Sequence, residues 1–115
     1  MTLKELCDQA HKNAKEKGWW NESTHNIPEK LALIHSEISE SLEEYRKLKP
    51  GEILSLSEIY FSSGQKPEGF GVELADTVIR IADLCGYLGI DLEKVVQLKM
   101  KYNKTRSYRH GGKIC

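Results

Sequence analysis

The segment 69–87 constrains the fold most, because apolar side chains cover about half of its circumference when it is wound as a helix. Its polar remainder is one continuous stripe, formed by Glu73, Asp76, Arg80 and Asp83. Its apolar side chains, with Leu88 just beyond it, are Val72, Leu74, Ala75, Val78, Ile79, Ile81, Ala82, Cys85 and Leu88. A helix with so broad an apolar arc needs more than one packing partner.

Three further segments also predict helices. Residues 2–17, 27–48 and 91–106 place apolar side chains at helical spacing. Thr2 and Asp91 are candidate N-caps, since each precedes the first apolar positions of its segment. The sequence therefore predicts four helices.

The connection at residues 50–67 is long, and residues 54–61 within it fit one short helix. Residues 19–26 are expected to form a loop. We find no repeat and no alternating pattern that a strand requires. The expected fold is all-α: one four-helix, bundle-like domain over residues 1–107, followed by a tail at 108–115.

The second predicted helix carries an apolar stripe with an acidic residue beside it. Glu37 falls at the edge of that stripe, which predicts a partly buried carboxylate. The stripe, expected to face the core, consists of Ile27, Leu31, Ile34, Ile38, Leu42 and Tyr45.

Composition narrows the function classes. The 115 residues include 17 basic and 17 acidic ones, so no net field favours nucleic acid, although basic residues gather at 99–113. Three cysteines without C-x-x-C spacing, and no signal peptide, predict a reduced, cytoplasmic protein. The apolar stretches are too short to span a membrane.

Two acid pairs carry the chemistry: Glu37 with Glu40, and Glu73 with Asp76. Each pair is spaced three residues apart and so shares a helix face. A single such pair is usually solvated surface charge. Two pairs on consecutive helices that pack antiparallel would face each other, and hard cations such as Mg²⁺ prefer such oxygen ligands. The spacing therefore predicts a metal site.

The runs 30–43 and 73–80, which contain these pairs, resemble the E-x-x-E and E-x-x-D signature of the MazG-like all-α nucleoside triphosphate pyrophosphohydrolases, relatives of the dCTP pyrophosphatases. The resemblance covers residues 18–110. It implies cleavage of a nucleoside triphosphate between the α and β phosphates, to the monophosphate and pyrophosphate. It also implies Mg²⁺ as the cofactor, with Mn²⁺ as a substitute, bound by the four acidic residues.

The resemblance also assigns roles outside the acid pairs. Trp19, Trp20 and His25 would form the base side of the pocket. Glu40 is the candidate for positioning the attacking water. The β and γ phosphates would be held by three residues of the fourth helix, which share one face: Lys99, Asn103 and Arg106.

Arg80 departs from the family pattern, because some relatives that hydrolyse pyrimidine nucleotides place an aromatic residue near the base there. Their substrate preference is therefore not carried over. The broad apolar arc of residues 69–87 predicts a homodimer or homotetramer. Two alternatives stay open: a non-catalytic module of the same fold that binds nucleotides or a protein, and a small nucleic-acid-binding protein that uses the basic C-terminal stretch.

Overall fold

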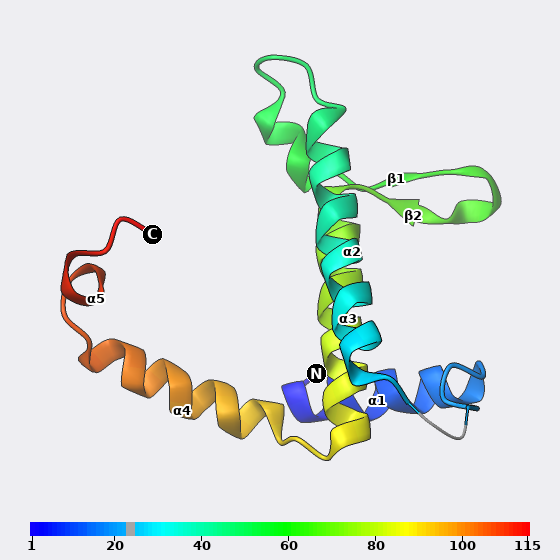
Figure 1. The fold of residues 1–115 in the computed structure, drawn as a ribbon. Helices are drawn as coiled ribbons and strands as arrows, with labels where there is room; N and C mark the ends of the chain where they lie inside the picture. The colour runs from blue at the N-terminus through cyan, green and yellow to red at the C-terminus, as the bar shows by residue number, and fades with distance from the viewer. Residues whose placement is uncertain (23–24) are drawn as a thin grey trace.

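The computed structural model describes residues 1–22 and 25–115, and these are mostly helical (Figure 1). Of the predicted loop at 19–26, Ser23 and Thr24 lie outside the described residues. The long helices are α1 (Leu3–Glu16), α2 (Ile27–Arg46), α3 (Phe70–Leu88) and α4 (Leu92–Thr105). All four were predicted, with ends that differ by at most two residues.

Side-chain caps explain where three of these helices begin. Thr2 Oγ1 accepts a hydrogen bond from the Glu5 amide, and Asp91 Oδ1 accepts one from the Lys94 amide, as the sequence predicted. Asn26 Oδ1 caps α2 in the same way, with Pro28 in its first turn. The start of each of these helices is therefore encoded locally.

The centre of the molecule is the pair α2 and α3, which run antiparallel along each other, with α1 crossing the C-terminal end of α3 (Figure 1). At this crossing, Cys7 packs against Ala82 and Cys85. Gly86 completes the contact, because a Cβ at this position would lie 2.6 Å from the His11 Cβ and 2.9 Å from the Cys7 carbonyl oxygen. Small side chains thus allow α1 and α3 to approach closely.

The connection between α2 and α3 contains a small hairpin that the sequence did not predict. The 3₁₀ helix η1 (Ile53–Ser57) leads into β1 (Tyr60–Phe61), which pairs antiparallel with β2 (Pro67–Glu68) across η2 (Ser63–Gln65). Strands of two residues are too short to show an alternating pattern, which explains why the prediction missed them. The Tyr60 hydroxyl donates a hydrogen bond to Glu44 Oε2 at 2.9 Å and so ties β1 to α2.

Helix α4 leads away from α2 and α3, and α5 (Arg109–Gly112) adds one irregular turn in the predicted tail (Figure 1). The Cα radius of gyration is 17.1 Å, whereas a compact chain of this length would have about 13 Å. The four helices therefore do not close into a bundle within one chain.

The predicted core stripe of α2 is largely uncovered. Leu31, Ile38, Leu42 and Tyr45 are each 47–48% exposed, whereas the buried residues of α2 are Glu37 and Ser41. Among the described residues, no large side chain is fully buried. The expectation that this stripe faces the core of a single chain was wrong, because α3 packs against the Glu37 and Ser41 face.

No helix in the described ranges combines the length and the apolar character needed to cross a membrane.

Candidate functional site: an acidic cluster beside an aromatic cavity

Three carboxylates meet between α2 and α3. Glu37 of α2 and Glu73 and Asp76 of α3 each offer one oxygen, and these oxygens lie within 4.8 Å of one another. Glu37 is 7% exposed, in agreement with the prediction of a semi-buried acid. The antiparallel pairing of α2 and α3 therefore brings the two predicted acid pairs to one level.

Glu73 is the most perturbed acid of this cluster. Its Oε2 is buried and has no hydrogen-bond partner among the residues that the structure describes. Burial raises the pKa of the Glu73 carboxyl to about 7, and Glu40, Asp76 and Glu37 act in the same direction. An unpartnered carboxylate oxygen beside other carboxylates fits a hard divalent cation, which would satisfy this oxygen and neutralise the repulsion.

Asp76 and Glu40 complete the set. Burial, followed by the charge of Glu37, raises the pKa of Asp76, while Arg80 and Lys66 act against this rise. Glu40 is exposed, but it lies close enough to Glu73 to raise the pKa of that carboxyl. Glu40 therefore stands at the solvent side of the cluster.

Arg80 is the one positive group bound directly to a carboxylate of the cluster in the described part of the chain. Its Nε donates a hydrogen bond to Glu37 Oε1 at 2.6 Å. The side chain of Arg80 remains 42% exposed. The sequence did not predict that Arg80 pairs with Glu37, because the two residues are 43 positions apart. Asp76 and Asp83 lie within one turn of Arg80 on the same helix and were the more obvious partners.

A cavity of about 500 Å³ adjoins the acids. Glu37 and Asp76 line it together with Arg80, and Trp19 and Trp20 contribute aromatic surface. The other lining residues come from α1, α2 and α3 and are Ala10, Asn13, Ala14, Lys30, Leu33, Ile79, Asp83 and Leu84. The volume is within the range of ordinary small-molecule sites.

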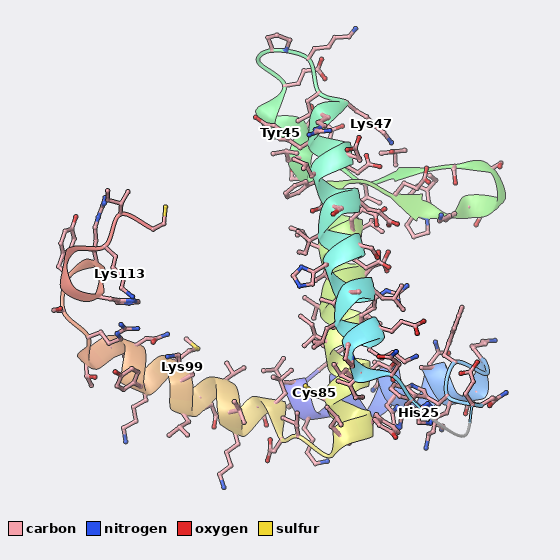
Figure 2. All side chains as sticks on the ribbon, in the orientation of Figure 1. His25, Tyr45, Lys47, Cys85, Lys99 and Lys113 are labelled. Carbon is pink, nitrogen blue, oxygen red and sulfur yellow. The ribbon has the colours of Figure 1, made fainter. Side chains whose placement is uncertain are left out.

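Asp83 organises the aromatic side of this cavity. Its Oδ1 accepts a hydrogen bond from Trp20 Nε1 at 2.9 Å and lies 2.9 Å from His11 Nδ1. Trp20 stacks on Tyr87, with ring centroids 4.1 Å apart and an interplanar angle of 10°. His25 contacts both rings edge-on, and Figure 2 shows it at the junction of α1 and α3.

The two tryptophans therefore differ in availability. Lys30 Nζ lies 4.4 Å from the Trp20 ring centroid, and it must occupy the face opposite Tyr87, because that ring fills the first face. Both faces of Trp20 are thus covered, whereas Trp19 is 68% exposed. His11, Lys30 and Tyr87 were not predicted, because nothing local in the sequence marks them.

The predicted phosphate-binding residues lie elsewhere in this chain. Lys99, Asn103 and Arg106 are on or at the end of α4, and Figure 2 shows Lys99 away from the α2 and α3 pair. Lys99 and Arg106 both lie over the ring of Tyr102, at 4.9 and 5.7 Å from its centroid. Within one chain, the structure does not bring these residues to the acidic cluster.

Comparisons with protein-family models, with curated proteins and with solved structures each found no match for this chain.

Proposed function

We propose that this protein is a nucleoside triphosphate pyrophosphohydrolase that depends on Mg²⁺, or on Mn²⁺ as a substitute. The observation that carries the proposal is the buried, unpartnered Glu73 Oε2 within a cluster of carboxylates that opens into an aromatic-lined cavity. The cluster supplies oxygen ligands and the cavity has room for a nucleoside. The motif spacing that resembles the MazG-like family supports the same reading.

In this proposal the ligands are Glu37, Glu73 and Asp76, with Glu40 on the solvent side. Mg²⁺ held by these residues would neutralise phosphate charge and help to activate the attacking water. Glu40 is exposed at the solvent side of the cluster, next to Glu73, and from this position it would orient the attacking water and accept its proton. The products are a nucleoside monophosphate and pyrophosphate.

The aromatic side of the cavity would hold the base. Trp19 has the exposed ring and is the better stacking surface. Trp20 and His25 form the supporting wall, since Asp83 and Tyr87 fix the Trp20 ring in place. A base would stack on Trp20 only after displacing Lys30.

The exposed apolar surface supports assembly with a second copy. The stripe of α2 that includes Leu31, Ile38 and Leu42 is half exposed, and α4 exposes Leu98 and Met100. An exposed apolar stripe on a helix, as on α2, marks an interaction site. We propose a homodimer or homotetramer in which α4 of one copy brings Lys99, Asn103 and Arg106 to the cavity of another, where they bind the β and γ phosphates.

The proposed function is tested by Glu37→Gln and Asp76→Asn, assayed for pyrophosphate and orthophosphate with Mg²⁺ and a panel of nucleoside triphosphates. Each variant is expected to lose more than about a hundredfold in pyrophosphate release, with unchanged helical circular dichroism. Unaltered release in either variant, or orthophosphate as the wild-type product, would contradict the proposal. Equal triphosphate binding with and without Mg²⁺, with no turnover, would indicate the non-catalytic module.

A further inference from the structure

Arg80 stands between the two halves of the candidate site. On α3 the polar stripe begins at the acidic cluster, continues through Arg80 and ends at Asp83. Asp83 holds Trp20, and the rings of Trp20, His25 and Tyr87 are called the aromatic wall below. With a rise of about 1.5 Å per residue, Arg80 lies roughly 6 Å along the helix from Asp76 and roughly 4.5 Å from Asp83. Arg80 lines the cavity at this midpoint.

The present partner of Arg80 is a proposed metal ligand. Arg80 Nε bonds to Glu37 Oε1 at 2.6 Å, and the same carboxylate offers an oxygen to the cluster of three acids. A guanidinium on Glu37 and a divalent cation beside it repel each other at this range. The two cations therefore compete for Glu37.

We infer that Arg80 is a substrate-positioning residue that Glu37 holds in the ligand-free protein, and that metal binding releases its guanidinium to the α phosphate of the nucleotide. This inference rests on the proposed function. A guanidinium matches the planar, two-oxygen geometry of a phosphate, so the released group has a suitable acceptor in the ligand.

The position along α3 selects the α phosphate. A nucleotide whose base lies against the aromatic wall and whose scissile bond lies at the acids has its α phosphate between them, beside Arg80. The present partner of Arg80 is Glu37, whereas Asp83 Oδ1 accepts a hydrogen bond from Trp20 Nε1 and lies 2.9 Å from His11 Nδ1. The exposed side chain of Arg80 leaves it free to turn into the cavity.

The test measures two affinities by calorimetry on the full chain. The first ligand is Mg²⁺ alone, and the second is an α,β-methylene nucleoside triphosphate with saturating Mg²⁺, tried with each common base. The variants are Arg80→Gln and Arg80→Lys. The matched control is Arg46→Gln, because Arg46 pairs with Glu43 at 3.2 Å on the exposed surface of α2, outside the cavity.

Arg80→Gln is expected to bind Mg²⁺ about tenfold more tightly and the nucleotide analogue about tenfold more weakly. Arg80→Lys keeps the positive charge and is therefore expected to bind Mg²⁺ with the weaker, wild-type affinity. The control Arg46→Gln is expected to leave both affinities unchanged. These opposite signs support the inference, because a purely structural role for Arg80 would weaken both affinities together.

Weaker binding of both ligands by Arg80→Gln, or no change in either affinity, would overturn the inference while leaving the proposed function in place. Failure of the wild-type protein to bind Mg²⁺ would overturn the proposed function, and this inference with it.

Discussion

Glu73 makes the stability of the metal-free protein depend on pH. Its folded-state pKa is raised from the ordinary 4.5 to about 7, chiefly by burial. A carboxyl with a raised folded pKa holds its proton more tightly in the folded state, so its favourable contribution is complete below pH 4.5. That contribution is lost as the pH rises through 7. The metal-free protein should therefore lose stability across this interval.

The size of this loss follows from the pKa. Because each tenfold change in proton affinity is about 1.4 kcal/mol, a rise from 4.5 to about 7 amounts to at most about 3.5 kcal/mol. Solvent screening at the partly exposed site and coupling to the other acids reduce this value, so we expect about 1–3 kcal/mol. Glu73→Gln removes the titration and should be more stable than the wild type at pH 8 by this amount.

The assay is urea unfolding, followed by circular dichroism, at a series of pH values from 4.5 to 8.5 with EDTA and again with Mg²⁺. The informative quantity is the difference between wild type and Glu73→Gln, because all the other titratable groups are common to both proteins and their contributions cancel. Mg²⁺ should raise the wild-type stability at pH 8 and have less effect on the variant. Glu43→Gln, on the exposed side of α2, is the matched control.

A constant difference between wild type and Glu73→Gln at every pH would refute the electrostatic reasoning about Glu73. A wild-type protein that gains stability relative to the variant as the pH rises would refute it as well. Either result would mean that burial does not raise the folded-state pKa of Glu73 as the structure indicates.

Two further predictions concern the helix crossing and the assembly. Gly86→Ala should cost about 2–3 kcal/mol of unfolding free energy, since the new Cβ would lie 2.6 Å from the His11 Cβ. The control Gly71→Ala, whose new Cβ meets nothing within 4 Å, should not destabilise the protein. Equal urea midpoints for the two variants would refute the close crossing of α1 and α3. Leu42→Glu should shift the protein toward monomer in sedimentation, and mixing Asp76→Asn with Arg106→Ala should recover up to about a quarter of the activity if α4 acts in the partner's site. A monomeric wild type would exclude that arrangement.

Local sequence was sufficient to predict the four long helices and to predict which acidic residues share a helix face. Thr2 and Asp91 satisfy free amides of their own first turns, so their effect does not depend on distant residues. Glu37 was expected at the edge of the interior, and it is buried. Helical periodicity also placed Glu73 and Asp76 on one face, and the antiparallel partner brought that face to Glu37.

Other parts of the site depend on contacts between distant segments. Arg80 pairs with Glu37 of another helix, and Asp83 pairs with Trp20 and with His11 of α1. Helical periodicity states which side chains share a face, but not which neighbour meets that face. For this reason the sequence predicted the group of acidic residues but not that Arg80 pairs with one of them.

The sequence by itself determined where the helices lie and which carboxylates share a face, because 3.6-residue periodicity and capping are local properties. Only the tertiary structure decided that α2 turns Glu37 and Ser41 inward while Ile38 and Leu42 stay half exposed. That choice depends on how α3 packs against α2. The direction of α4 depends in the same way on the few contacts that hold it, which no pattern within α4 specifies.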